Sequence, residues 1–324
     1  HLVCAAWEKP LDDKDKEFFG SNVDALVAEL DQEGKLRKRQ ERWYPSPALT
    51  YPAQDVNIRA TSGQYAIIDS PGCLLETVEA SVAFFQIHPG AIYLHQGESY
   101  LITELDLVRH IALAVPTFVN YYTQAKDITD IGIVKIAKEK DCCGVKVYLG
   151  DVDVTTTVVG FKKKRQFTEE VIGEESLDLP PQRFFTRALW FDLPQKVVDR
   201  IADAGLHFHG GLHACEHAAI GILPLFALCD RNDIGGVSTP FQPDTGKAQI
   251  FIYDAYPGGI GIAEKGFEMI TELWQATLKV VEECPCSDGC PSCVQSPKCG
   301  NNNQPLDKKA AIILLQGLAG NCTN

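Results

Sequence analysis

The chain has 324 residues, of which 45% are hydrophobic, so it is long enough to form two or three domains with sizeable cores. Its 43 acidic and 30 basic residues give a net charge of −13, which repels a polyanion on average and requires any nucleic-acid contact to be local. No run approaches the roughly 18 uninterrupted apolar residues of a membrane span, which argues against a membrane partner.

The first fifty residues combine one amphipathic helix with a basic run. Apolar residues recur at helical spacing between Ser21 and Gly34, with a serine placed to cap the first turn and a glycine placed to end the last. Residues 35–42 then carry five cations and one glutamate before Trp43 and two prolines. A helix, a glycine turn and a basic strand are typical of the recognition helix and wing of a winged-helix module, which we predict for residues 1–50.

The cations of this run are candidates for contact with nucleic-acid phosphates, and a solvated charged face is the structural alternative. They are Lys35, Arg37, Lys38, Arg39 and Arg42. The aromatic residues that follow, Trp43 and Tyr44, could stack on bases, although packing is the more ordinary use of both.

Residues 51–170 lose the helical period and contain short β-rich runs separated by turn residues. This spacing predicts an antiparallel sheet or a small barrel, with a strand over residues 56–60 and a hairpin at His95-Gln96-Gly97-Glu98. A second basic run closes the region and is a further candidate for phosphate contact. It consists of Lys162, Lys163, Lys164 and Arg165.

Residues 171–324 return to the helical period after an acidic, proline-containing link. We expect helices over residues 197–204, over 213–229 with a kink at Pro224, over 262–283, and from a cap at Asp307 to Gly320. The fold class predicted for the whole chain is therefore α+β, with a winged-helix-like unit, a β-rich middle and a helical C-terminal part.

The helix over 262–283 leads into CPCSDGCPSC, in which four cysteines follow the pattern C-x-C-x3-C-x2-C. Zinc binds four thiolates in a tetrahedron, and the glycine and prolines of this run allow closely spaced thiolates to converge. The predicted ligands are Cys284, Cys286, Cys290 and Cys293. Four protein ligands leave no position for a substrate, so such a zinc site is structural and contributes folding energy.

Several alternatives to this assignment remain. Disulfides between such close pairs are strained and are disfavoured in a reducing compartment, and a redox pair at Cys290 and Cys293 leaves two thiols unexplained. An iron–sulfur cluster is also compatible with four cysteines. A fifth cysteine, Cys299, follows beyond a short loop and leaves open which four of the five bind the metal.

The segment from His213 to His217 fits H-x-x-E-H, the inverted pattern of zinc proteases. In that pattern two histidines one helical turn apart bind the metal and the glutamate, here Glu216, acts as general base. The sequence does not identify a third ligand, and the flanking residues resemble packed core. A metallohydrolase is therefore the rival functional hypothesis, and hydrogen-bonded histidines in a buried turn are its structural alternative.

Two negative observations and one weak motif concern nucleotides. The glycine-rich turn YDAYPGGIG at 253–261 could present amide groups to a phosphate, but a simple loop requirement explains it as well. No G-x-x-x-x-G-K-[ST] sequence occurs, so the chain carries no P-loop for a nucleoside triphosphate. The chain also begins at His1 without a methionine or a secretory leader, and we expect it to be a segment of a longer protein.

These motifs, in this order and spacing, resemble the C-terminal half of the MrfA and Hrq-type superfamily-two DNA helicases. The resemblance runs nearly end to end. It rests on CAAWEKPL, FFG, RWYP, VNIR, HPGAIYLHQGESY, LDL, ALWFDLP, GLHACEHA, YDAYPGGIG and CPCSDGCPSC with SPKCG and LDK.

The resemblance implies an ATP-driven translocase that moves 3′ to 5′ on single-stranded DNA and serves DNA repair. Since the sequence shows neither a membrane span nor a secretory signal, we expect a cytoplasmic location, associated with the nucleoid or the nucleus. The motor domains of the same polypeptide would precede His1, and this chain would hold a non-catalytic winged helix and zinc domain that help grip DNA. The matching zinc ligands are the four cysteines between 284 and 293. A protein-interaction module, in which the net acidity matters more than the basic runs, is a third hypothesis.

Overall fold

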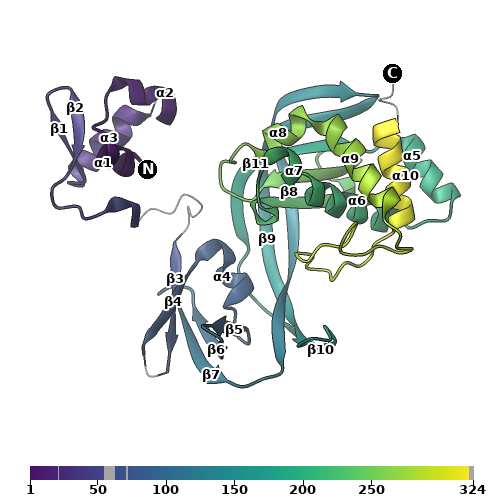
Figure 1. Ribbon diagram of the computed structural model, residues 1–324, viewed down its shortest axis with the longest axis horizontal. Coiled ribbons are helices and arrows are strands. Elements are labelled where there is room, and N and C mark those ends of the chain that lie inside the picture. Colours follow the sequence, from purple (N-terminus) through teal and green to yellow (C-terminus); the bar gives the residue numbers. More distant parts are fainter. Residues whose placement is uncertain (21, 55–62, 71, 321–324) are drawn as a thin grey trace. The chain divides into compact units, whose positions relative to one another are not determined.

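The computed structural model describes residues 1–20, 22–54, 63–70 and 72–320 (Figure 1). It divides into two compact units, His1–Gly63 and Gln64–Asn324, and each is described by itself. No helix among the described residues is long and apolar enough to cross a membrane.

The first unit consists of three helices followed by a two-stranded hairpin. Its elements are α1 (Leu2–Glu8), α2 (Lys16–Phe19), α3 (Val23–Gln32), β1 (Leu36–Arg39) and β2 (Arg42–Pro45), with short 3-10 turns at Asp13–Asp15 and Pro52–Gln54. Apolar residues of α1, α3 and β1 form its core, in which Val27 and Leu36 are almost fully buried. The order of helix, glycine turn and basic strand is as predicted, and the strand continues into a hairpin, whereas the predicted serine cap lies outside the described residues.

The second unit begins with a five-stranded sheet in the order β4-β3-β7-β6-β5. Its elements are β3 (Gln64–Asp69), β4 (Leu74–Glu79), α4 (Ala80–Gln86), β5 (Ile92–His95), β6 (Glu98–Asp106) and β7 (Ile111–Thr117). The hairpin predicted at residues 95–98 is confirmed, because His95 pairs with Glu98 and both turn residues have positive φ. The sequence analysis missed α4, and the strand predicted over 56–60 lies outside the described residues.

A six-stranded antiparallel sheet follows, in the order β10-β9-β11-β13-β12 with β8 paired to β9. Its strands are β8 (Tyr121–Cys142), β9 (Val145–Arg165), β10 (Val171–Ser176), β11 (Gln182–Asp192), β12 (Ile234–Gln242) and β13 (Lys247–Asp254). The side chains of Gln242 and Asp244 bond the backbone of β8 at Ile131 O (3.0 Å) and Ile133 N (2.8 Å). These bonds join the far edge of β8 to the β12–β13 turn, so the sheet is nearly closed.

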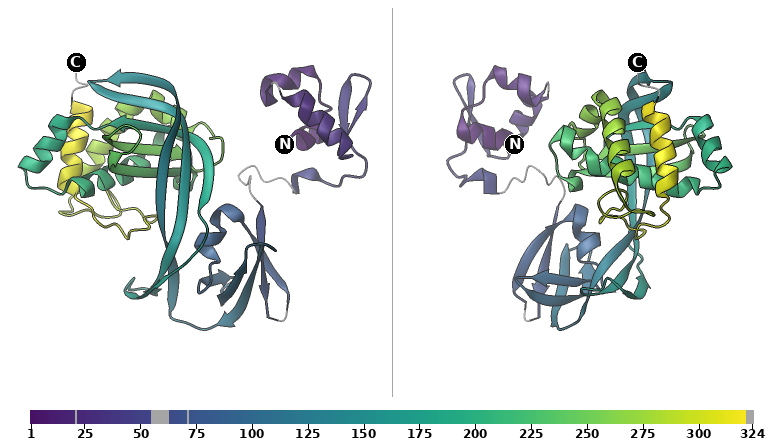
Figure 2. Two further views of the ribbon diagram at one scale, coloured as in Figure 1. Left: turned by 180° about the vertical axis from the view of Figure 1, so that it is seen from behind. Right: turned by 45° about the vertical axis from the view of Figure 1, so that its right-hand side comes forward.

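Helices cover one face of this sheet, and the views of Figures 1 and 2 agree on that arrangement. They are α5 (Gln195–Asp203), α6 (Phe208–Ile222), α7 (Pro224–Ala227), α8 (Ile262–Glu268), α9 (Ile270–Glu283) and α10 (Lys308–Ala319), with a 3-10 turn at Arg231–Asp233. The helix predicted over 213–229 with a kink at Pro224 is two helices, α6 and α7, which are separated at Leu223 directly before the proline. The helix predicted over 262–283 is instead two helices that meet at Met269, where the backbone leaves the helical region.

Both faces of the central strands are buried, since side chains alternate between two cores. In β11, Leu189 and Phe191 pack under the helices, whereas Ala188 and Trp190 pack on the opposite face. Strands buried on both faces have continuous apolar sequences without alternating polar residues. No strands were predicted after residue 170, so β11, β12 and β13 were missed, whereas the helices predicted over 197–204 and 213–229 correspond to α5 and to α6 with α7, and the α+β class is confirmed.

The predicted division into 1–50, 51–170 and 171–324 differs from the two compact units. β9 and β10, on either side of residue 170, pair with each other in one sheet. The two sides of that boundary therefore share backbone hydrogen bonds, and the division at 170 stays a prediction about domain organisation.

Candidate metal centres and nucleic-acid interface

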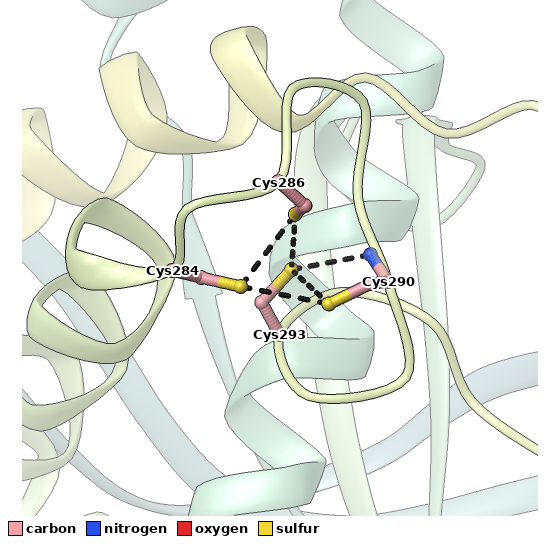
Figure 3. A group of neighbouring side chains, drawn as sticks. All are labelled: Cys284, Cys286, Cys290 and Cys293. Atoms are coloured by element: carbon pink, nitrogen blue, oxygen red, sulfur yellow. Dashed lines mark hydrogen bonds between the residues drawn. The ribbon is translucent and has the colours of Figure 1, made fainter.

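Four cysteine side chains converge immediately after α9, as Figure 3 shows. Cys284 ends the helix with an extended backbone, and the chain then loops back on itself. The Sγ atom of Cys284 lies 3.5 Å from those of Cys286 and Cys290, Cys286 lies 3.5 Å from Cys293, and Cys290 lies 3.8 Å from Cys293. All four sulfurs thus surround one point.

The loop geometry that brings the sulfurs together depends on Gly289. Its φ is +110°, and a Cβ there would lie 2.4 Å from the side chain of Val294. The carbonyl of Cys290 then accepts the N–H groups of Cys293, Val294 and Gln295, which forms a tight turn. The glycine that the sequence analysis singled out in this run is therefore required by both backbone conformation and space.

The donor set and its spacing fit a tetrahedral metal. Zinc–thiolate bonds of about 2.3 Å at tetrahedral angles place sulfurs about 3.8 Å apart, close to the distances found here. A disulfide needs about 2.05 Å, so the sulfurs are not paired in that way. The N–H of Cys290 also donates to Sγ of Cys293 at 3.3 Å, a bond that stabilises a thiolate.

Electrostatics at the cluster also favour deprotonation of one sulfur. Burial alone raises the pKa of the Cys286 thiol, but hydrogen bonds from Cys293, Cys284 and Cys290 outweigh it and bring the pKa to about 7. Burial raises the pKa of Cys293 to about 12. The neighbouring thiols therefore share their protons in a way that stabilises a negative charge on Cys286.

A buried cation faces this cluster. Lys308, the first residue of α10, is only 6% exposed, and its Nζ donates to the carbonyls of Cys284 and Cys286 at 2.7 Å each. It also lies 3.4 Å from Sγ of Cys286. A divalent metal with four thiolates carries two net negative charges, which this ammonium partly neutralises. The sequence analysis did not assign this role, because the lysine and the cysteines are brought together only by packing of α10.

A second group of potential ligands lies beside the first. The ligand atoms of His213, His217 and Cys299 lie within 4.8 Å of one another, and Cys299 Sγ is 3.5 Å from His213 Nε2. Cys299 is thus placed outside the four-cysteine cluster and against α6. Burial alone raises the pKa of its thiol, but the neighbouring His217 ring and the backbone N–H groups of Asn303 and Asn301 leave that pKa below its ordinary value.

The glutamate of the H-x-x-E-H segment lies elsewhere. Glu216 is buried against β12, where it accepts hydrogen bonds from Ser238, and a Cβ on Gly236 would lie 2.7 Å from its Oε1. Burial raises the pKa of its carboxyl group. Because its carboxyl group is engaged by β12, Glu216 is not aimed at the two histidines as a general base would be.

The predicted basic run of the first unit forms the β1–β2 hairpin. Leu36 of β1 is buried and the next three residues are exposed, so the cations project from the hairpin. Lys35 pairs with Glu33 at 2.8 Å and Lys38 pairs with Glu41 at 3.5 Å. In the described part of the chain three arginines of this hairpin form no ion pair. They are Arg37, Arg39 and Arg42.

The second basic run lies at the end of β9, and its charges are largely paired. Lys163 pairs with Glu175 at 2.5 Å, Lys164 with Glu169 at 3.6 Å, and Arg165 with Glu170 at 3.1 Å. Lys162 and Lys164 are each only 8% exposed. These contacts tie β9 to β10 and its turn, and the predicted phosphate contact of this run stays a prediction.

Comparison with known families matches two parts of the chain. Residues 1–61 match the winged-helix domain of ATP-dependent helicase HRQ1, and residues 215–294 match the MrfA Zn-binding domain. The second match includes the four-cysteine cluster, whereas His213 and Cys299 lie outside it.

Relatives align with nearly the whole chain. The chain is 31% identical to the uncharacterized ATP-dependent helicase YprA of Bacillus subtilis over 97% of its length, and 28% identical to ATP-dependent helicase HRQ1 of Saccharomyces cerevisiae over 99%. A crystal structure of the DUF1998 helicase MrfA bound to DNA matches 98% of the chain with a TM-score of 0.56 and 30% identity. The chain spans only 41%, 31% and 42% of these three proteins, respectively.

The two family matches, their order along the chain and the end-to-end similarity agree with one another and with the fold. The chain belongs to the family of MrfA and Hrq1 helicases, and it corresponds to the C-terminal region that carries their winged-helix and zinc-binding domains.

Proposed function

We propose that the chain is the non-catalytic, DNA-engaging accessory region of an ATP-dependent helicase that moves 3′ to 5′ on single-stranded DNA and acts in DNA repair. The observation that carries this proposal is the alignment of almost the entire chain with helicases, one of which was crystallised with DNA. The motor domains belong to the same polypeptide, and the protein is located with the chromosome, in the cytoplasm or the nucleus.

Zinc is the metal we assign to the four-cysteine cluster, with Cys284, Cys286, Cys290 and Cys293 as its ligands. The tetrahedral sulfur spacing and the matched zinc-binding domain support this assignment. When bound, zinc supplies folding energy rather than a reaction centre, because the thiolates fill its coordination sphere. The cluster fixes the loop after α9, in which Cys293 and Val294 belong to the main core.

The β1–β2 hairpin is the DNA contact we favour in this chain. Three of its arginines form no ion pair with the residues that the structure describes and stand on an exposed edge, and each can form charge-assisted hydrogen bonds with a phosphate. The ion-paired cations at the end of β9 are weaker candidates for DNA contact, because a phosphate would have to displace a glutamate from each of three residues.

Replacement of Arg37, Arg39 and Arg42 by alanine in the full-length helicase tests this contact. Each phosphate contact to single-stranded DNA contributes about 0.7 to the slope of log K against log salt, so loss of three contacts flattens the slope by about 2. Binding of a fluorescent oligonucleotide would be measured at several salt concentrations.

A matched control removes three exposed cations from the helical part of the chain: Lys196, Arg200 and Lys309. This control changes the net charge by the same amount and should leave the slope unchanged. Equal effects of the two triple variants would mean that only the overall charge matters, and an unchanged slope in the hairpin variant would refute the contact.

A further inference from the structure

We propose that His213, His217 and Cys299 form a second metal site, which binds a divalent transition metal, zinc foremost, with water in the fourth position. The three ligand atoms lie within 4.8 Å of one another, although Cys299 is 86 residues from His213 in the sequence. Neither matched domain includes all three residues.

The spacing of the ligand atoms agrees with a tetrahedral centre. Bonds of about 2.05 Å to nitrogen and 2.3 Å to sulfur at tetrahedral angles separate the two ligand atoms by about 3.6 Å. His213 Nε2 and Cys299 Sγ are 3.5 Å apart. The two imidazole rings are neighbours, with centroids 4.2 Å apart at an angle of 61°, and their ligand atoms and the Cys299 sulfur all lie within 4.8 Å of one another.

The outer hydrogen bonds of both histidines are those expected of metal ligands. His213 Nδ1 lies 2.9 Å from the carbonyl oxygen of Pro305, and His217 Nδ1 lies 3.0 Å from that of Val294. A carbonyl only accepts, so each Nδ1 carries the proton and donates it, which leaves the lone pair of a neutral ring on Nε2. Metal-bound histidines typically donate their second ring N–H to such an acceptor.

The cysteine has a matching environment. Cys299 Sγ is buried and accepts the backbone N–H of Asn303 at 3.2 Å, as Cys293 Sγ accepts that of Cys290 in the first cluster. An N–H bond to sulfur stabilises the thiolate, which is the metal-binding form. The second group thus repeats a feature of the first.

The position of this site gives it a structural role. The carbonyl groups of Val294 and Pro305 accept the hydrogen bonds of the two histidines, and these two residues lie on either side of the loop that carries Cys299. A bound metal therefore fastens this loop to α6. A cavity of about 30 Å³ beside His217 has room for water but not for a substrate. Glu216 bonds to Ser238 on β12, so the metal has no general base beside it as a hydrolase would.

Metal content of the full-length protein, purified without chelators and with any histidine tag removed, tests the proposal. We expect two metal ions per chain in the unmodified protein by inductively coupled plasma mass spectrometry. Cys299→Ser and His217→Ala should each retain one. The cobalt-substituted protein should lose the absorption of a site with one thiolate and two imidazoles on Cys299→Ser.

Matched controls are His209→Ala, an exposed histidine one helical turn before His213, and Cys229→Ser, a half-buried cysteine outside both groups. Both should retain two ions. One ion in the unmodified protein that Cys290→Ser removes would overturn the second site and leave the four-cysteine assignment intact. If the unmodified protein holds one ion that Cys299→Ser removes and Cys290→Ser does not, the second site is supported and the four-cysteine site is refuted. Two ions in the Cys299→Ser variant would overturn the second site.

Discussion

Replacement of Lys308 by methionine tests whether the zinc site depends on its buried cation. Methionine has a similar length without charge, so the change removes the ammonium from its position 3.4 Å from Cys286 Sγ and from two carbonyls at 2.7 Å. The carbonyl bonds form without the metal, whereas the attraction to a doubly negative metal–thiolate cluster requires bound metal. The change should therefore weaken zinc binding as well as the fold.

The expected loss of zinc affinity is about 10- to 100-fold, the usual range for residues that contact ligands rather than the metal. This corresponds to about 1.4–2.8 kcal/mol at 1.4 kcal/mol per factor of ten. Competition with a chromophoric chelator measures it, in a Cys299→Ser background so that only the four-cysteine cluster is titrated. The exposed neighbour provides the control, since Lys309→Met removes the same charge one residue away. Equal zinc affinity in the two lysine variants would refute the reasoning.

Three further predictions concern packing, pH and the second basic run. A Cβ on Gly211 of α6 would lie 2.6 Å from that of Ala310 on α10, so Gly211→Ala should lower the free energy of unfolding by about 1–3 kcal/mol, whereas Gly132→Ala, with open space around it, should not. Burial lowers the pKa of His88 in the folded protein, so the unfolded chain takes up a proton there first as the pH falls below about 6.5. The free energy of unfolding should then fall by up to about 1.4 kcal/mol per pH unit. In denaturant titrations from pH 7 to 5, His88→Phe should remove this part of the pH dependence. Lys163→Ala breaks an ion pair with β10, so we expect the salt dependence of DNA binding to equal that of the unmodified protein. A slope of log K against log salt that is flattened by about 0.7 would instead indicate that Lys163 contacts a phosphate.

Local patterns in the sequence predicted the elements that depend on local interactions. Apolar spacing, turn residues and caps were enough to predict α3, the hairpin at residues 95–98 and α10. Asp307 caps α10 as predicted, because its side chain accepts the N–H of Ala310 at 2.9 Å. Each of these features is complete within a few residues, so the sequence alone contains the information.

Elements that depend on distant contacts were missed or misjudged. β8 and β9 form one hairpin of 22- and 21-residue strands. Register shifts interrupt the alternation of β8, which the sequence patterns divided into short runs, whereas most of β9 was predicted as one run. β11 and β13 are apolar on both sides because helices cover one face, while on the other face side chains of the nearly closed sheet pack against one another, and this burial is not encoded in a period of two. Their assignment needs the tertiary structure that they themselves help to form.

The two metal groups differ in the same way. The first lies within ten residues, from Cys284 to Cys293, so its pattern alone indicated a metal. The second joins one turn of α6 to a cysteine 86 residues later, and the sequence analysis accordingly found two histidines without a third ligand and a fifth cysteine without a partner. In the second group, Cys299 is the third ligand that the two histidines lacked, and the histidines are the partners that Cys299 lacked. If both groups bind metal, the loop from residue 284 to 307 is fastened at its start to α9 and α10 and farther along to α6, which explains how a segment without helix or strand is held against the core. A chelator titration should then release the two ions in separate steps, with His217→Ala abolishing one step only, and a single step in the unmodified protein would contradict two independent fastenings.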